Sequence, residues 1–510
     1  MELYDAAVIG AGHNGLVAAA YLARTGLSVI VLERAERLGG AAVSEPTWPG
    51  YTVSTGSYVC SLLDPQVIED LQLRSHGYDA YLKDPWSFTP LRDGRSLMLG
   101  RDSSANEREI ASFDAQDVRG FHAFEEVAAA LGSRLYETFS EADPSFTRFE
   151  EKTQELLGGS VADLVERFVR TPVLAAMLVN DGLVGTYAGP RDPGTAYVLA
   201  HHYAGRALGT QGAWGFVRGG MGAISRALAQ SAQQAGAHIR DTASVIRIGV
   251  RDGRAESVVL SDGSEFKARS ILSNAHPQTT FLDLVPSGAL APQFLQRVRS
   301  WETIGPSLKL NLALGELPNF SARPGTHLQA HHKASIHVAP SVEYLQTAYE
   351  DARAGAISKA PMLECFMQTP TDASLAPRGK HILSIFAQYY PHDRADEPWT
   401  ASSRAAVADS IIAVLAHHAP NIPSAIEERQ LLAPPDLEAR FGLRGGHIFH
   451  GELLPGQIYE RRFATRTPLA GLYLSGSGAH PGGCVSGFPG KRAARAVLHD
   501  LRTTSVAARA

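Results

Sequence analysis

The chain has 510 residues, of which 44% are hydrophobic and 19% are charged, a composition typical of a folded globular protein. Its 47 basic and 52 acidic side chains give a formal net charge of −5 without a basic stripe, so we do not expect nucleic acid as a partner. The three cysteines, Cys60, Cys365 and Cys484, form no C-x-x-C pair, which argues against a zinc site and against a redox-active disulfide.

The first segment predicts a dinucleotide-binding unit. A buried strand over 5–9 ("DAAVI") precedes Gly10, Gly12 and Gly15, which form a G-x-G-x-x-G pattern, and a helix follows. Gly10 permits the tight turn, Gly12 lets a diphosphate reach the backbone, and Gly15 lets helix and strand pack closely. The next strand ends in Glu33, whose carboxylate is placed to accept hydrogen bonds from a ribose diol.

A second glycine pair, Gly39-Gly40 in "ERAERLGG", comes soon after the acidic end of that strand. Adjacent glycines indicate a close approach to the backbone, here by the ribityl chain of a flavin, although a helix C-cap followed by a turn also fits. Further on, "WGFVRGGMGAIS" repeats part of the fingerprint, but Ser225 stands where the third glycine belongs. We therefore interpret this stretch as a turn that begins an amphipathic helix.

Residues 105–205 show helical periodicity, and Thr171-Pro172 marks the start of a further helix. We interpret these helices as facing the core, with an apolar substrate tunnel or membrane-facing surface as the alternative. The longest apolar run, 173–179, is far too short to span a bilayer. A strand begins almost at Met1, which leaves no room for a signal peptide. We expect a cytoplasmic protein and leave peripheral membrane contact open.

The central region predicts antiparallel strands over 242–266 that return to a buried strand at 270–273. Val245 is placed to offer its backbone to an adenine. Residues 305–440 mix strand-like runs with one long helix. We expect an α/β fold with α+β insertions in two discontinuous domains. The dinucleotide-binding domain would take 1–65, 205–290 and 440–510, and the substrate domain 66–204 and 291–439, with 105–204 as its helical part.

The C-terminal stretch "GLYLSGSGAHPGGCVSGFPGKRAARAVLHDL" repeats the plan of strand, glycine loop and helix. The helix is predicted to begin near Val485 to Gly487, and its free N–H groups would stabilise negative charge. If the bound group is a flavin, that charge lies at the N1–C2=O edge of its ring. The N-terminal motif would then hold the diphosphate and this one the isoalloxazine.

On these motifs the sequence resembles the phytoene desaturase-like flavoproteins, a branch of the amine oxidase and glutathione reductase-like FAD group. The resemblance covers essentially the whole chain and rests on "AAVIGAGHNGLVAAAYLARTG", "VLERAERLGGAAVSE", "WGFVRGGMGAIS", "SILSNAHP", "IFHGEL" and "LYLSGSGAHPGGCVSG". It implies a Rossmann-type FAD-binding domain of the glutathione reductase/amine oxidase-like kind, with a discontinuous substrate domain. Together with Val245, the residues expected to line FAD are Gly10, Gly12, Asn14, Gly15, Glu33, Arg34, Gly39, Gly40, Ala41, Gly478, Val485 and Ser486.

The resemblance also implies a reaction. Two hydrogens would leave a hydrophobic, isoprenoid- or carotenoid-like molecule, with the hydride going to flavin N5 and oxygen or a quinone accepting the electrons. A redox-neutral isomerase that uses reduced FAD, a flavin-retaining scaffold protein and an NAD(P)-linked reductase are the alternatives. Cys484, in the place of a glycine usual in the family, and the hydroxyl-bearing Ser54-Thr55-Gly56 put the family's substrate in doubt for this chain.

His480 and Tyr58 are the candidate catalytic residues. His480 lies among the C-terminal glycines, where an imidazole is suited to accept a proton, although a histidine that fixes the loop by hydrogen bonds fits at least as well. Tyr58 is a candidate for lining the face of the flavin ring. His201 and His202 border the pocket in one interpretation and form a partly exposed pair on a helix in the other.

Overall fold

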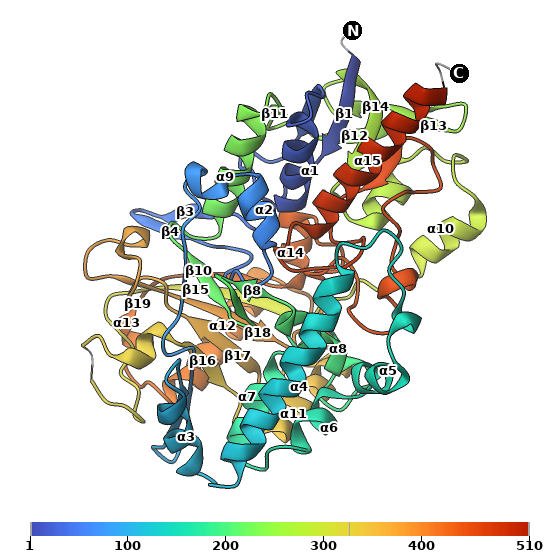
Figure 1. Cartoon of the computed structure of the whole chain (residues 1–510). Coiled ribbons are helices and arrows are strands. Elements are labelled where there is room, and N and C mark those ends of the chain that lie inside the picture. Colours follow the sequence, from blue (N-terminus) through green and yellow to red (C-terminus); the bar gives the residue numbers. More distant parts are fainter. Residues whose placement is uncertain (1–2, 326, 508–510) are drawn as a thin grey trace.

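The computed structural model describes residues 3–325 and 327–507, and it places the first strand inside a seven-stranded sheet (Figure 1). The strands of this sheet are β1 (Leu3–Ile9), β2 (Val29–Leu32), β11 (His238–Arg240), β12 (Val245–Arg251), β13 (Arg254–Leu260), β14 (Glu265–Ser273) and β20 (Leu472–Leu474). β1 pairs in parallel with β2 and with β14, and β20 pairs in parallel with the end of β14. β12 and β13 add the antiparallel layer that the sequence predicts.

Three helices cover this sheet: α1 (His13–Ala23), α9 (Gly222–Gln234) and α15 (Phe488–Ala507). α1 contacts both of the others, and its run of buried alanines over 18–20 lets them pack closely. The two ends of the chain therefore lie at the same end of the molecule (Figure 1). The partial fingerprint at 214–225 leads into α9, as predicted, and α15 begins one residue after the predicted range.

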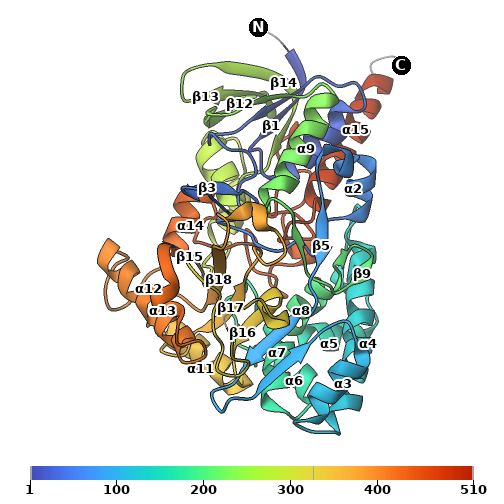
Figure 2. The same cartoon turned by 90° about the vertical axis from the view of Figure 1, so that its left-hand side faces the viewer.

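A second seven-stranded sheet lies beside the first (Figure 2). In spatial order its strands are β19 (Ile426–Leu432), β15 (Ser307–Leu314), β18 (His381–Gln388), β17 (Met362–Phe366), β16 (Ser335–Val338), β6 (Ser87–Pro90) and β7 (Ser96–Leu99). Alternate residues such as Leu308, Leu363 and Ile385 pack in one core with α12 (Ala401–Ala416). The residues between them, including Lys309 and Glu364, therefore point to the opposite face.

The third layer is helical and shares a large apolar core with that opposite face. Its helices are α3 (Ser103–Ala111), α4 (Asp117–Thr138), α5 (Glu151–Gly158), α6 (Val161–Glu166), α7 (Pro172–Asn180) and α8 (Thr195–Tyr203). Thr171 and Pro172 take the N-cap and first positions of α7, as predicted. No helix of the described residues is long and apolar enough to cross a membrane.

The remaining elements are short connections around these layers. The helices are α2 (Pro65–Asp70), α10 (Pro292–Arg299), α11 (Val342–Arg353), α13 (Ile422–Ala425) and α14 (Pro434–Phe441). The two-stranded ladders are β3 (Glu45–Trp48) with β4 (Tyr51–Val53), β5 (Ala80–Leu82) with β10 (Gly215–Val217), and β8 (Arg206–Ala207) with β9 (Thr210–Gln211). Short helical turns lie at Leu73–His76, Phe146–Arg148, Thr279–Leu284, Ala330–Lys333, Ala373–Leu375 and Tyr459–Arg461.

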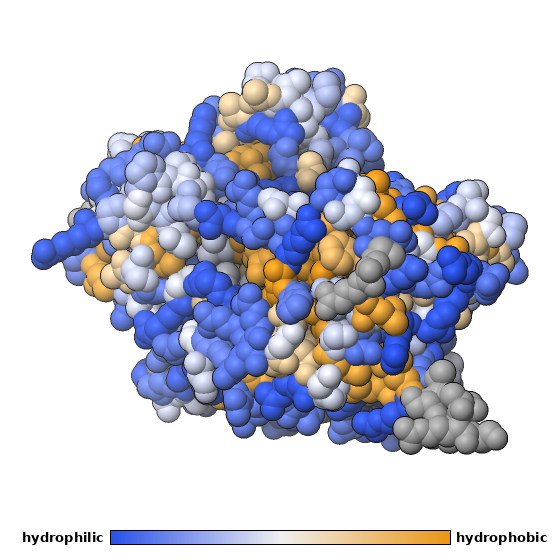
Figure 3. All heavy atoms as spheres, turned by 90° about the horizontal axis from the view of Figure 1, so that it is seen from above, coloured by the Kyte–Doolittle hydropathy of each residue, from blue (hydrophilic) through white to orange (hydrophobic). Residues whose placement is uncertain are grey.

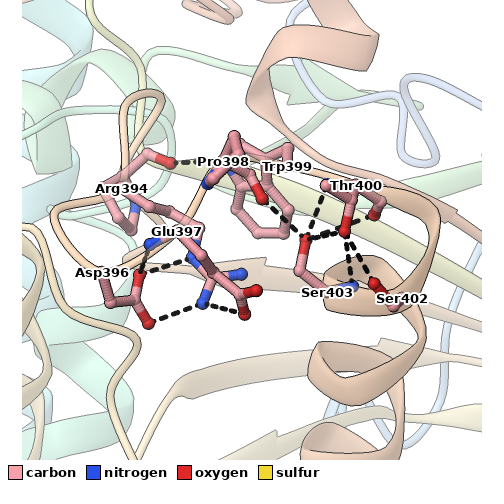
Figure 4. A network of polar contacts seen from close by, with 9 residues as sticks. Arg394, Asp396, Glu397, Pro398, Trp399, Thr400, Ser402 and Ser403 are labelled. Atoms are coloured by element: carbon pink, nitrogen blue, oxygen red, sulfur yellow. Dashed lines mark hydrogen bonds and ion pairs between the residues drawn. The ribbon is translucent and has the colours of Figure 1, made fainter.

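The turn before α12 shows how polar side chains hold such a connection (Figure 4). Arg394 donates hydrogen bonds to Asp396 at 2.7 and 3.0 Å and to Glu397 at 3.0 Å. Thr400 and Ser403 then close a capping box at the start of the helix.

On the face seen from above, charged and polar residues cover most of the surface, and apolar residues gather near its centre (Figure 3).

Candidate active site

A cavity of about 600 Å³ lies between the two large sheets. Its lining comes from segments far apart in the chain: the turn after β1, the end of β2, the loop at 39–45, residues 56–59, the end of β14, β15, and the loops at 440–450 and 477–485. Parallel strands that end together at one edge of a sheet form the usual ligand crevice of such folds. The sequence motifs therefore meet in one place.

The glycine turn has the geometry that a diphosphate-binding loop needs. Gly10 has a φ of +92°, which an L side chain rarely adopts. A Cβ on Gly15 would lie 2.2 Å from the carbonyl oxygen of Gly10, so this glycine permits the close packing of α1 on β1. Gly12 and Asn14 line the cavity at the start of α1, where free N–H groups favour anions.

Glu33 lies at the end of β2 and joins it to the glycine turn. One carboxylate oxygen accepts the N–H of Ala11 at 2.7 Å, and the other accepts the N–H of Ala35 at 2.9 Å. Arg34 donates to the carbonyl oxygens of residues 439 and 440 at 3.4 Å, which brings α14 to the same end of the cavity. Glu33, Arg34 and Val245 all line that end, where the adenosine part of a dinucleotide is expected.

The second glycine pair packs directly on the first turn. Gly39 donates its N–H to the carbonyl of Ala11 at 2.9 Å, and a Cβ on Gly40 would lie 3.5 Å from the Cα of Gly12. Residues 33–40 contain no helix, so a helix C-cap is the wrong interpretation of this pair. Gly39, Gly40 and Ala41 line the cavity next to the nucleotide turn.

The C-terminal loop is placed partly in the wall and partly behind it. Val485 lines the cavity, together with Ser477 and Cys484, which the sequence did not predict as contacts. Gly15, Gly478 and Ser486 are not among the lining residues, and a Cβ on Gly478 would lie 2.2 Å from Pro277. Contacts of these three residues with a cofactor stay predictions, because none of the three lines the cavity.

His480 lies outside the cavity lining, in contrast to the role expected of a proton acceptor. Its ring packs against Tyr459 and Phe139, with ring centres 4.9 and 6.1 Å apart, and its Nε2 lies 3.3 Å from the carbonyl oxygen of Thr138. Burial holds the pKa of this imidazole well below its usual range. These contacts agree with the alternative role, fixing the loop against α4, and a catalytic role of His480 stays a prediction.

Tyr58 lines the cavity, and its contact with a flavin ring stays a prediction. It adjoins a polar row that sequence reasoning missed. Lys309 on β15 and Glu364 on β17 both pair in register with Phe386 on the strand between them, and His337 on β16 continues the row. Because the strands are neighbours in the sheet, residues far apart in sequence share one face. No local motif marks such a row, although a lysine inside the apolar run "SLKLNLALG" is a signal for a buried charge.

Tyr58 lies between the other two ionisable groups of this corner and contacts both of them. The Tyr58 hydroxyl donates to Glu364 at 3.3 Å, and Lys309 Nζ lies 4.4 Å from the centre of the Tyr58 ring and donates to Ser384. Burial lowers the pKa of Lys309 to about 7 and raises the pKa of Glu364 to about 7. Both groups therefore change protonation near neutral pH.

A second layer of buried charge lies behind Glu364. Burial lowers the pKa of Lys83 to about 8 and raises the pKa of Asp181 to about 8, and the charges of Glu364 and Lys83 act on one another. His202 lies beside this layer, because its Nδ1 is 2.7 Å from the carbonyl oxygen of Asp181. His201 and His202 are both fully buried, so the interpretation as a partly exposed pair is wrong, and His202 lines the cavity.

The strand, glycine turn, acidic strand end, second glycine pair and C-terminal helix together define a site for a dinucleotide whose second half lies against the loop at 477–485. Buried polar atoms such as Nε2 of His276 have no protein partner among the described residues, as expected where a polar cofactor supplies one. The residues present thus fit FAD, the cofactor of a large class of oxidoreductases with this architecture.

Comparisons with known proteins agree with this class. A family model described as flavin containing amine oxidoreductase matches residues 15–498. The chain is 40% identical to the mouse (Mus musculus) pyridine nucleotide-disulfide oxidoreductase domain-containing protein 2, over 98% of this chain and 94% of that protein. It is 28% identical to hydroxyneurosporene desaturase of Cereibacter sphaeroides, over 98% of each. Cyclohexylamine oxidase from Brevibacterium oxydans shares the fold, with a TM-score of 0.55 at 15% identity over 98% of this chain and 99% of that one.

The chain therefore belongs to the flavin-containing amine oxidoreductase family, and FAD is its cofactor. The family agrees with the sequence-based expectation of a Rossmann-type FAD-binding fold with amine oxidase-like architecture. All three cysteines are free thiols in this structure.

Proposed function

We propose that the protein is an FAD-dependent dehydrogenase that removes two hydrogens from a hydrophobic, uncharged small molecule. The observation that carries this proposal is the composition of the cavity wall around Lys309. Trp214, Phe386 and Phe449 line it with aromatic rings, and Val184 and Ile448 add aliphatic surface. Such a wall favours an apolar substrate, since it offers a large area for hydrophobic contact and few hydrogen-bonding groups.

The lack of a carboxylate beside Lys309 argues against a cationic substrate. Among the described residues no carboxylate lies within ion-pair distance of this lysine, so a protonated amine would bury its charge on an apolar wall without a partner. One relative supports a neutral substrate, since hydroxyneurosporene desaturase is named for a desaturation. The apolar, isoprenoid-like substrate expected from the sequence is therefore retained in this proposal, with oxygen or a quinone as electron acceptor.

The chain's own residues supply a proton acceptor for this reaction. FAD, when bound, accepts the hydride at N5. Lys309, in its neutral form, takes the second hydrogen as a proton from the neighbouring carbon, so that the substrate loses one hydride and one proton and gains a double bond. The Tyr58 ring faces the ammonium group that forms, and the nearby charge of Glu364 favours it.

Anaerobic mixing of the purified yellow protein with neutral alkenes and alcohols tests the proposal. We expect loss of the visible flavin absorbance together with a product that has two fewer hydrogens, and recovery of the colour when oxygen or a quinone is added. Product formation that requires prior dithionite reduction and leaves the flavin colourless would instead support the isomerase. A flavin spectrum that no compound changes would support the scaffold protein.

A further inference from the structure

Besides His202, three histidines line the cavity and take no part in the proposed reaction. His13 is the first residue of α1, directly after Gly12. His276 follows β14 and lies near Asn274, whose side chain contacts the glycine turn. The rings of His276 and His450 pack together with their centres 5.1 Å apart. Two of these histidines belong to the motifs "SILSNAHP" and "IFHGEL", to which the nucleotide-binding pattern assigns no contact.

The tautomer of His276 follows from its hydrogen bond. Its Nδ1 accepts the backbone N–H of Gln278 at 3.1 Å, so the ring proton of the neutral imidazole is on Nε2. Burial holds the pKa of this ring well below its usual range, and the side chain is 1% exposed. The Nε2–H group is therefore a buried donor, and it has no acceptor in the part of the chain that the structure describes.

His447 provides an internal comparison. Its Nδ1 accepts the backbone N–H of Phe449 at 3.2 Å, which fixes the same tautomer. Its Nε2 lies 3.2 Å from a carboxylate oxygen of Glu452, within ion-pair distance but without the geometry of a hydrogen bond. The two histidines thus share one local geometry, but a carboxylate lies beside Nε2 of His447, and none lies within ion-pair distance of His276 in the part of the chain that the structure describes. A ligand in the cavity is the natural source of the missing acceptor.

His13 and His450 each have a buried ring nitrogen that also lacks a hydrogen-bond partner among the described residues. Nε2 of His13 and Nδ1 of His450 are buried without a hydrogen-bond partner in the described residues. Burial lowers the pKa of His13 to about 4 and that of His450 to about 3, and the charge of Arg462 lowers the latter further. Near neutral pH these rings are uncharged hydrogen-bonding groups.

We propose that His276, with His13 and His450, forms a cluster of neutral imidazoles that hydrogen-bonds the flavin-side half of FAD, meaning its ribityl chain and adjoining phosphate. The cluster lies away from the adenosine end marked by Glu33, because the His13 ring hydrogen-bonds the backbone of Cys484 in the C-terminal loop. The proposal rests on FAD as the cofactor and does not depend on the substrate or on the proton acceptor.

The variant His276→Asn isolates the free donor. An asparagine oxygen two residues before Gln278 can still accept its backbone N–H, so the local turn is kept, while the amide NH2 ends short of the position of Nε2. We expect FAD to bind the full-length apoprotein about tenfold more weakly, the loss of one good hydrogen bond. The melting temperature of the apoprotein should stay unchanged, because the hydrogen bond to the backbone of Gln278 is kept. His276→Gln, which restores a distal N–H, should recover most of the affinity.

Two further measurements make the assignment specific. Calorimetry with ADP in place of FAD should give the same affinity for the wild type and for His276→Asn. The control variant His417→Asn, at an exposed position, should leave the affinities for both FAD and ADP unchanged. Wild-type FAD affinity in His276→Asn would overturn the proposal. An equal loss of affinity for ADP would place the contact at the adenosine half of FAD and contradict the proposed contact with the flavin-side half. If the melting temperature of the His276→Asn apoprotein falls far enough to account for the lost affinity, the role of His276 is purely structural and the proposal is overturned.

Discussion

Lys309 Nζ lies 4.4 Å from the centre of the Tyr58 ring, on the wall of the cavity that also contains the glycine turn. The strand β15 places the lysine there, and a loop after β4 places the tyrosine. No carboxylate lies within ion-pair distance of Lys309 among the described residues. A buried amine in this position loses its proton more readily than an exposed one, which suits it to accept a proton near neutral pH.

Replacing this lysine should slow the reaction with the flavin still bound. We expect Lys309→Met to lower the anaerobic rate of flavin reduction by about 10²- to 10⁴-fold, the usual contribution of a positioned base. Because the acceptor must be neutral, the wild-type rate should rise with pH through about 7 and level off above it. Stopped-flow absorbance as a function of pH gives both quantities.

The matched control removes a lysine that is half-exposed and lies just before β18. Lys380→Met loses an ion pair with Glu427, away from the cavity, and should keep the wild-type rate and pH profile. If Lys309→Met keeps the rise in rate near pH 7, the proton acceptor is another group.

Glu364→Gln should shift the pH profile. The negative charge of Glu364 raises the pKa of Lys309, so its removal should lower the apparent pKa and extend activity to more acidic solution. An unchanged profile, measured by the same stopped-flow series, would show that Glu364 has no influence on the reacting group.

Glu33→Ala should weaken FAD retention through two effects. It removes the acceptor expected for the ribose diol, and it frees the N–H groups of Ala11 and Ala35 that hold the glycine turn against β2. We expect a loss of more than about tenfold in affinity. The ratio of flavin to protein absorbance after gel filtration measures it, with exposed Glu126→Ala on α4 as the control. A fully loaded variant would contradict the assignment.

Gly483→Val should disturb the site by way of Phe449. A Cβ at this position would lie 1.9 Å from the phenylalanine ring, so the clash is with a cavity-lining side chain and not directly with a flavin, as the sequence alone would imply. We expect an altered flavin spectrum and lower occupancy in Gly483→Val. The double variant with Phe449→Ala should recover part of both. A single variant with a normal spectrum would show that the loop tolerates the side chain.

Lys491→Met should destabilise the fold. Lys491 Nζ lies 2.7 Å from Asp64, both side chains are 2% exposed, and the pair joins α15 to the start of α2. Removal of one partner leaves a buried charge uncompensated, which costs about 3–5 kcal/mol of unfolding free energy. Urea denaturation should show this loss, and the double variant Asp64→Asn/Lys491→Met should recover part of it. A loss below about 1 kcal/mol would mean that water reaches Asp64.

The nucleotide half of the site was predictable because its constraints are local. Gly10, Gly12 and Gly15 must stand at fixed spacing for the turn to form, and Glu33 ends the adjacent strand. The reacting half was not predictable, because Lys309 and Glu364 meet through the register of three strands, which no short motif encodes. His480 lies in the right loop, but its side chain turns toward Phe139 and Tyr459, and sequence alone does not give that direction.

The most direct test of the account compares neutral and cationic compounds of equal size on the same holoprotein. Alkenes and alcohols are mixed anaerobically with it beside matched primary amines, and the visible flavin absorbance is followed at pH 8, about one unit above the pKa of Lys309. We expect at least one neutral compound to bleach the flavin, the matched amine to leave it unchanged, and Lys309→Met to slow the bleaching. Bleaching by amines alone would contradict this expectation.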